Sequence, residues 1–220
     1  MKKLLSFALW LVASGTCGAA VTNNFAKWEK DMAAFERADK SNPPPQQAVL
    51  FIGSSGIRLW KTLAQDFPEH RVINRGFGGS HIADAAHFAG RIIIPCAPRL
   101  IVLRSGGNDI HAGKSPEQVC ADFKAFVSTV RAKLPDVKIV FVGQNPTPAR
   151  WKNRDREQAA NTLIRDYIKQ TPRLVYVENW GKVLGADGLP RTELFVADQL
   201  HFSAAGYEIL TDLIRPTLRD

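Results

Sequence analysis

Five short and continuously apolar runs constrain the fold of this chain more than any other feature of its sequence. They are rich in β-branched residues and lie at residues 48–53, 71–74, 100–104, 138–143 and 174–178. Runs of this length that do not alternate with polar residues are typical of strands buried on both faces of a sheet. We therefore predict five buried strands.

Stretches in which apolar residues recur with a helical period separate these runs. They lie at residues 57–65, 82–94, 116–134 and 154–170, and a last one spans 204–213. Phe25, Trp28, Met32 and Phe35 indicate an earlier amphipathic helix, which three prolines at 43–45 end. Strands that alternate with helices form parallel sheets covered on both faces. The predicted class is α/β, with a three-layer α/β/α sandwich around a five-stranded parallel sheet.

The first twenty residues differ in composition from the rest. Lys2 and Lys3 precede an apolar run at 4–13, and small residues follow up to Ala20. This order is typical of a secretory signal peptide, so we expect a signal at 1–20, one domain at 21–220 and a periplasmic or secreted location. A lipoprotein is less favoured, because the residues around Cys17 form a poor lipobox. No later apolar stretch reaches the roughly 20 residues that a spanning helix needs, so we expect no membrane span.

The charged and metal-binding residue types indicate few partners. The formal charge is +8, but Lys and Arg are scattered, which favours a solvated surface and no nucleic-acid partner. No CxxC or HExxH motif is present, and His81 and His87 are spaced for different helix faces, so we expect no metal and no cofactor. After signal removal Cys96 and Cys120 remain, and an oxidising compartment would permit a disulfide if the fold brought them together. The sequence leaves that pairing and the oligomeric state open.

A tight turn of small residues follows the first predicted strand. The segment Gly53-Ser54-Ser55-Gly56 precedes a helical stretch, and such a turn can expose a nucleophile or cradle an anion at a helix N-terminus. It differs from the G-x-S-x-G elbow, because Gly56 directly follows Ser55. A Gly/Ser turn that only caps a helix is the alternative interpretation.

Polar or glycine residues follow the next two strands as well. Gly79 lies in a glycine-rich segment after the second strand and could donate its amide to an oxyanion. Asn108 follows a glycine pair after the third strand, and taken alone this pattern is more typical of a turn. Near the C-terminus, Asp198 and His201 are three residues apart, a spacing that places two side chains together on one helical turn. Because carboxyl ends of parallel strands share one sheet edge, we expect these residues to converge there.

These four blocks resemble the SGNH, or GDSL-like, hydrolase superfamily, which carries a nucleophilic Ser, a Gly, an Asn and a D-x-x-H motif in this order. The resemblance covers about residues 28–216 and is greatest to small esterases of the platelet-activating-factor acetylhydrolase type. It implies a flavodoxin-like fold, an esterase activity, and no cofactor. One departure is Ser54, which stands where the superfamily usually has Asp, and it puts substrate preference in doubt.

The resemblance implies a role for each matched residue. Ser55 would be the nucleophile, His201 the general base, and Asp198 the carboxylate that orients the imidazole. The amides of Ser55 and Gly79 and the side chain of Asn108 would form the oxyanion hole. The expected substrates are short-chain esters, acetyl esters first, carried by a small molecule or an acylated glycan.

Two rival functions remain open at this point. The same triad would serve a carbohydrate O-acyltransferase, in which a sugar hydroxyl replaces water. A non-catalytic protein could instead use the Gly/Ser loops to bind a carbohydrate or an anion. Further residues near predicted strand ends could contact substrate or could serve packing alone; they are Trp60, His81, His111, Arg150 and Trp151.

Overall fold

The computed structural model describes residues 24–219, and in this range five strands form one parallel sheet in the order β2-β1-β3-β4-β5. The strands are β1 (Val49–Gly53), β2 (Val72–Gly76), β3 (Leu100–Arg104), β4 (Lys138–Val142) and β5 (Leu174–Val177). Each coincides with one of the five apolar runs, with ends shifted by at most two residues. The predicted parallel sheet is therefore confirmed.

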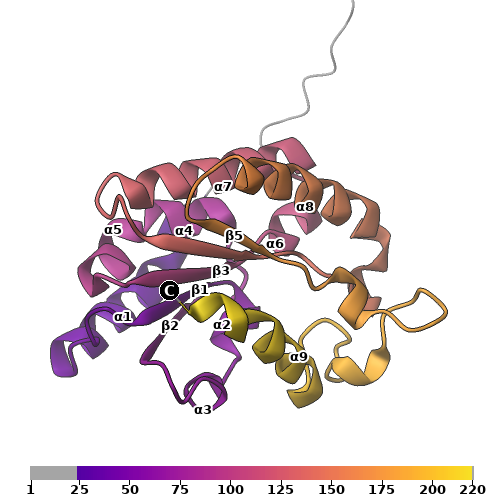
Figure 1. Ribbon diagram of the computed structural model, residues 1–220, viewed down its shortest axis with the longest axis horizontal. Helices are drawn as coiled ribbons and strands as arrows, with labels where there is room; N and C mark the ends of the chain where they lie inside the picture. The colour runs from indigo at the N-terminus through magenta and orange to yellow at the C-terminus, as the bar shows by residue number, and fades with distance from the viewer. Residues whose placement is uncertain (1–23, 220) are drawn as a thin grey trace, which may run out of the picture.

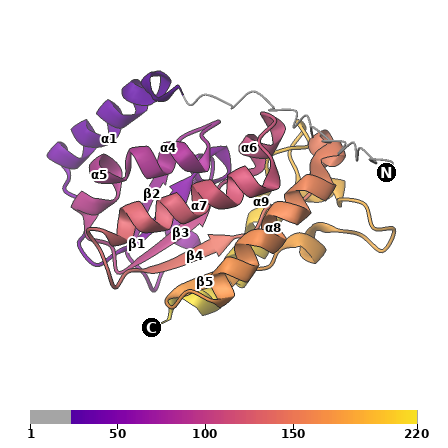
Figure 2. The same cartoon turned by 90° about the horizontal axis from the view of Figure 1, so that it is seen from above.

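Helices cover both faces of this sheet and make three layers (Figures 1 and 2). One face packs against α1 (Glu29–Ser41), α4 (Ile82–His87), α5 (Ala89–Ile92), α7 (Pro116–Arg131) and α8 (Arg154–Lys169). The other face packs against α2 (Ser55–Arg58), α3 (Leu63–Asp66) and α9 (Ala204–Ile214). The short helix α6 (Gly107–His111) follows β3. Short 3₁₀ segments lie between or beside these elements, at Phe25–Trp28, Ile94–Cys96, Pro148–Asn153, Trp180–Val183, Thr192–Leu194 and Arg215–Leu218.

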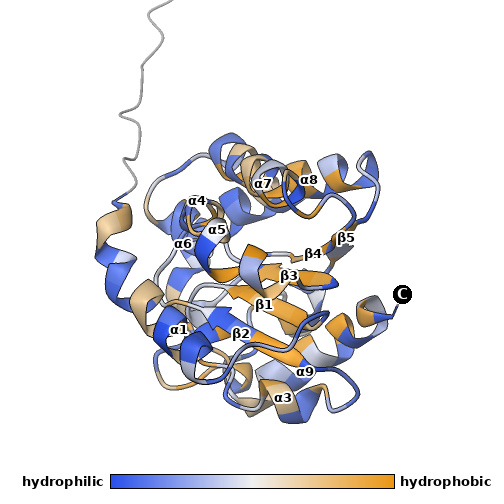
Figure 3. Ribbon diagram, turned by 90° about the vertical axis from the view of Figure 1, so that its left-hand side faces the viewer, coloured by the Kyte–Doolittle hydropathy of each residue, from blue (hydrophilic) through white to orange (hydrophobic). Residues whose placement is uncertain are grey.

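The central strand β1 shows why the apolar runs are continuous. Leu50 and Ile52 point into the core beneath α4 and α7, whereas Val49 and Phe51 point into the core beneath α3 and α9. All four are fully buried, and burying each such side chain stabilises the fold by roughly 1.5–3 kcal/mol. Figure 3 shows these apolar strands between the two helical layers.

Two helices predicted as continuous are broken in the structure. The stretch at 57–65 divides into α2 and α3 because Trp60 turns into the core, where it is 1% exposed, and its Nε1 donates to Asp66. The stretch at 82–94 divides into α4, α5 and a 3₁₀ turn, with the break at Phe88. Phe88 is buried against the rings of Phe25 and Phe77. Aromatic packing overrides the helical period in both places.

Cys96 and Cys120 are buried free thiols, so the two cysteines are not joined by a disulfide in this structure. Cys96 lies against Arg75, whose Nη2 is 3.4 Å from the sulfur. The sequence left this pairing open, and the structure does not contain the disulfide.

The predicted signal at residues 1–20 lies outside the described residues, so export stays a prediction. Between residues 24 and 219, no helix combines the length and the apolar character that crossing a bilayer requires.

Candidate active site

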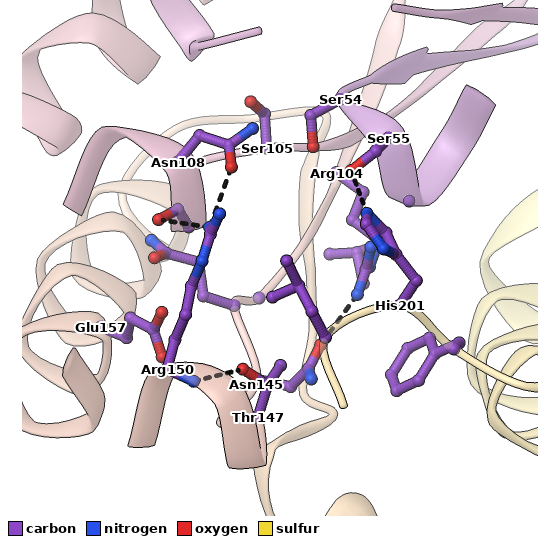
Figure 4. A pocket seen from close by; sticks show the side chains of 17 residues that line it. Ser54, Ser55, Arg104, Ser105, Asn108, Asn145, Thr147, Arg150, Glu157 and His201 are labelled. Carbon is purple, nitrogen blue, oxygen red and sulfur yellow. Dashed lines mark hydrogen bonds between the residues drawn. The ribbon is translucent and has the colours of Figure 1, made fainter. Parts of the chain in front are cut away.

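The predicted site residues lie around a pocket at the carboxyl ends of β1, β3 and β4. The chain reverses its direction across the sheet between β1 and β3, and in open α/β sheets ligands bind in the crevice outside such a switch point. Residues within 54–56, 104–108, 142–150 and 200–202 line the pocket, together with Glu157 of α8. Figure 4 shows their side chains arranged around the opening.

The small residues around Ser55 are required by Arg104 at the end of β3. A Cβ on Gly53 would lie 2.0 Å from the Arg104 carbonyl oxygen, and a Cβ on Gly56 would lie 1.8 Å from its Nη1. The N–H of Ser54 donates to the same carbonyl at 3.4 Å. β1 and β3 therefore approach closely at their ends, and Ser55 is placed at the first position of α2, facing the pocket.

Ser55, His201 and Asp198 form a continuous chain of hydrogen bonds. Ser55 Oγ lies 2.8 Å from His201 Nε2, and His201 Nδ1 lies 2.6 Å from Asp198 Oδ2. The other carboxylate oxygen accepts the backbone N–H groups of Leu200 and His201, both at 2.9 Å. The hydrogen bond from the His201 side chain, followed by that from its backbone, lowers the pKa of Asp198 to about 2.

These contacts decide the direction of each hydrogen bond. An ionised carboxylate only accepts, so Nδ1 of His201 carries the proton, and in the neutral ring Nε2 is left to accept from the Ser55 hydroxyl. The arrangement can therefore move the Ser55 proton to His201 while Asp198 remains charged.

The segment that carries Asp198 and His201 lies ahead of α9, as expected, and forms a loop rather than a helical turn. Phe195 and Phe202 pair across it in an antiparallel bridge, and their buried rings lie 5.3 Å apart. Val196 N–H donates to the His201 carbonyl at 2.8 Å. The bridge closes a tight loop, and this closure, rather than helical spacing, brings the two side chains together.

Asn108 lies across the pocket from His201 (Figure 4), at the second position of α6 and not in a turn. Its Oδ1 accepts from Arg150 Nη1 at 2.9 Å, and its Nδ2 donates to the Ser80 carbonyl at 3.2 Å. Both ends of the amide are thus held. Of the three residues predicted for an oxyanion hole, Ser55 and Asn108 line the pocket; Gly79 lies outside its lining, next to Ser80, with a φ of +82° that favours glycine.

On the opposite wall, Glu157 is deeply buried and Arg150 is half-buried. Glu157 is 3% exposed, and burial raises its pKa to about 7 although the Arg150 charge opposes this shift. Burial lowers the pKa of Arg150, whose own N–H is capped by Thr147 Oγ1 at 3.2 Å. The two side chains face the same cavity and are not in direct ion-pair contact there.

Of the five further residues singled out in the sequence, Arg150 alone lines the pocket. Trp60 is a core residue, as described above. His81 lies 3.9 Å from the buried Asp109, and His111 lies 3.3 Å from Asn153. Trp151 stacks under the guanidinium of Arg154.

Sequence reasoning missed the residues that follow β4. Gln144 and Asn145 come directly after this strand and line the pocket, so the rule about strand ends would have found them. Arg104 carried a signal too, because it is a charged residue at the end of a buried run. Glu157 lies within the regular pattern of α8, where nothing in the sequence separates it from solvated neighbours.

The described residues hold no group of three or more His, Cys, Asp or Glu side chains arranged to bind a metal ion.

Solved structures of other proteins share this fold, and three of them illustrate the range. A Streptococcus pneumoniae protein provisionally described as a platelet activating factor is 19% identical, with a TM-score of 0.79, over 88% of this chain and 94% of that one. A variant of an acetylxylan esterase from Geobacillus stearothermophilus is 16% identical, with a TM-score of 0.63, over 80% and 96%. A carbohydrate esterase of family 3 from Talaromyces cellulolyticus is 19% identical, with a TM-score of 0.62, over 77% and 95%.

The sequence comparisons are more decisive about the family. No curated protein matches the chain significantly. The model of the GDSL-like lipase/acylhydrolase family, however, matches residues 53–209, which include Ser55, Asn108, Asp198 and His201. The chain therefore belongs to the GDSL-like lipase/acylhydrolase family and is an ester-hydrolysing enzyme.

Proposed function

We propose that this protein is a serine esterase that cleaves short-chain carboxylic esters, acetyl esters first, through a Ser55–His201–Asp198 triad and an acyl-enzyme. One observation carries the proposal: the continuous chain of hydrogen bonds from Ser55 Oγ through the His201 ring to Asp198, at 2.8 and 2.6 Å. A nucleophile, a base and an orienting acid at such distances activate a hydroxyl that is otherwise a weak nucleophile.

In the proposed reaction, this geometry sets the path of each proton. His201 Nε2 takes the Ser55 proton as Oγ attacks the ester carbonyl, and then donates it to the leaving alcohol oxygen. Water then gives a proton to the same nitrogen as its oxygen attacks the acyl carbonyl. The bond from the acyl carbon to Ser55 Oγ breaks, Oγ takes the proton back from Nε2, and the acid is released. Asp198 stays ionised throughout, holds the Nδ1 tautomer and stabilises the imidazolium that forms twice in each turnover.

The negative charge that develops on the carbonyl oxygen needs donors on the pocket side of Ser55. We assign this role to the Ser55 N–H, at the start of α2, and to Asn108 Nδ2, with the Gly79 N–H as a third donor. Arg150 and the Ser80 carbonyl hold the Asn108 amide in place before substrate arrives. Donors that are already oriented stabilise a transition state without reorganisation.

Two observations other than the site geometry support the preference for short acyl groups. The chain resembles small acetylhydrolase-type esterases, and two proteins of the same fold are an acetylxylan esterase and a family 3 carbohydrate esterase. Ser54 lines the pocket beside Ser55 where related enzymes usually carry Asp. Its side chain makes no cap hydrogen bond to α2, so we do not assign it a catalytic role.

The test combines hydrolysis with labelling. The purified protein should hydrolyse 4-nitrophenyl acetate and butyrate faster than the octanoate, and an alkyl fluorophosphonate should modify Ser55 alone. Ser55→Ala should abolish both hydrolysis and labelling, whereas Ser54→Ala, the matched control, should keep both. Mass-spectrometric mapping of the adduct to any other residue would refute the assignment of the nucleophile.

A further inference from the structure

Two arginine side chains line the pocket from opposite sides. Figure 4 shows Arg150 beside Asn108 and Arg104 on the side of Ser55 and His201. Arg150 hydrogen-bonds neutral oxygens, those of Asn108 and the Gly107 carbonyl, through Nη1. Arg104 Nη2 donates to the neutral Asn145 Oδ1 at 2.9 Å. Within residues 24–219, neither guanidinium forms an ion pair with a carboxylate.

Arg75 shows how this protein treats a buried guanidinium elsewhere. Arg75 is 5% exposed, and its Nη2 pairs with Asp39 at 2.6 Å. A buried charge is ordinarily compensated by an opposite charge, because burial without a partner is unfavourable. Burial indeed lowers the pKa of both pocket arginines. Arg104 and Arg150 are half-buried and have no such carboxylate partner among the described residues; Arg104 lies over the ring of Phe202 instead.

The pocket also contains buried polar atoms without a hydrogen-bond partner. These are Ser105 Oγ, both side-chain polar atoms of Gln144, and Glu157 Oε2. Asn161 fixes Gln144 by clamping its backbone N–H and carbonyl, both at 2.8 Å. A purely hydrocarbon occupant would leave these groups unsatisfied, which is unfavourable for each of them. The occupant must therefore offer hydrogen-bonding atoms.

We infer that the pocket binds a carboxylate carried by the substrate, with Arg150 as its main partner and Arg104, Ser105 and Gln144 supplying further donors. The inference rests on the proposed esterase function and narrows its substrates to esters that bear a second, free acid group. That group can belong to the acyl part, as in a dicarboxylic half-ester, or to the alcohol part, as in an O-acetylated sugar acid. The shared chemistry is a carboxylate near the ester.

Glu157 is the one group in this wall that would oppose an anion. Its carboxyl faces the same cavity as Arg150, and the remaining ionisable groups of the pocket are Arg104 and the His201–Asp198 pair. Burial holds part of the Glu157 population neutral near pH 7, and a neutral carboxyl can donate to a bound carboxylate. Replacing Glu157 therefore distinguishes a pocket that binds an anion from one that binds neutral hydroxyl groups.

Two pairs of probes test the inference. In the acyl arm, 4-nitrophenyl hemisuccinate is compared with 4-nitrophenyl butyrate. In the alcohol arm, methyl O-acetylgalacturonoside is compared with its neutral methyl ester. In one arm we expect kcat/KM for the charged probe to exceed that of its neutral partner by about 10- to 100-fold, the range of a charge-assisted contact. The arm that responds identifies which part of the ester carries the acid.

Variants distinguish binding of the anion from the support that Arg150 gives to Asn108. Arg150→Met should slow both probes but bring their ratio close to one, and a purely structural role would leave the ratio unchanged. Glu157→Gln should increase the ratio, whereas a neutral-hydroxyl site would lose affinity for both probes. Arg154→Met, which removes an exposed arginine stacked on Trp151, should keep the wild-type ratio.

A binding measurement keeps this inference separate from the proposed function. Calorimetry with succinate and galacturonate should show binding to the wild-type protein and none to Arg150→Met. Binding of either acid without hydrolysis of any probe would refute the esterase proposal and still support the anion site. Hydrolysis with no charge preference in either arm, or no binding of either acid, would overturn the anion site.

Discussion

The two walls of the pocket are organised in opposite ways. On the wall of Ser55, His201 and Asp198, the side-chain groups of the proposed triad have partners at 2.6–2.9 Å. On the wall of Arg150 and Glu157, a half-buried guanidinium and a buried carboxyl face the cavity without a direct ion pair, and Glu157 Oε2 has no partner. The first wall is complete before substrate arrives, and the second is completed by what binds. We assign the covalent chemistry to the first wall and substrate selection mainly to the second, with Arg104 contributing to selection from the side of Ser55.

The largest effect is expected from breaking the complete wall at Asp198. Asp198→Asn removes the charge that orients His201 and stabilises its imidazolium, so kcat should fall by roughly 10⁴-fold, as for triads of this kind. Stopped-flow or steady-state hydrolysis of 4-nitrophenyl acetate measures this fall. Asp212→Asn, an exposed position on α9, is the control. A near-normal kcat in Asp198→Asn would show that the triad is wrongly assigned.

A smaller effect is expected at Asn108, where the two walls meet. Asn108→Ala removes a proposed oxyanion donor, so kcat should fall by roughly 10²- to 10³-fold with little change in KM. Because Arg150 holds this amide, the double variant Asn108→Ala/Arg150→Met should lose less activity than the product of the two single losses. Strictly multiplicative losses on a neutral ester would mean that Arg150 does not orient Asn108.

The smallest expected effect is on the free energy of unfolding, through the ionisation of Glu157 in the second wall. The pKa of Glu157 is raised in the folded protein from its ordinary 4.5 to about 7, so its contribution to stability is fully present below pH 4.5 and is lost as pH rises through 7. This loss amounts to at most about 3 kcal/mol. In Glu157→Gln the loss is absent, so between pH 4.5 and 8 the variant should gain stability relative to the wild type.

Urea unfolding of both proteins at the two pH values measures that gain. Glu208→Gln, at an exposed position on α9, should follow the wild type. Equal pH dependence in wild type and Glu157→Gln would show that the carboxyl ionises as freely in the folded protein as in the unfolded chain, and would remove the basis for treating this wall as incomplete.

The predictions about strands succeeded and those about some helices failed for one physical reason. A continuous apolar run such as 48–53 has few alternatives to a buried strand, whereas a helical period at 57–65 or 82–94 can be interrupted when one aromatic ring packs better elsewhere. Trp60 and Phe88 each end a helix in this way. The local helical period carries no information about such packing, because it depends on how the rings meet in space; Trp60 packs against Tyr207 as well as nearby rings, and Phe88 packs against Phe25 as well as Phe77.

The residues of the candidate site also differ in how far the sequence could predict them. Ser55, Asn108, Asp198 and His201 could be found in the sequence, because each lies at a strand end or in a short motif that matches the family. Their convergence on one pocket follows from the parallel sheet, which brings its carboxyl ends to a common edge. The role of each in the reaction remains a proposal that the variants above test.

The sequence by itself determined the α/β class, the five buried strands and the family, since these depend on periodicity and on motifs within a few residues. Only the tertiary structure decided what surrounds the nucleophile. Arg104, Gln144, Arg150 and Glu157 come from β3, from the segments after β4 and from α8. Arg104 and Gln144 lie near strand ends and Arg150 is one of several candidates in the sequence, but nothing local shows that the four share one cavity. Their burial, their missing partners and their shared cavity arise when the sheet and its helices close around them, because electrostatic environment depends on distances in space and not along the chain.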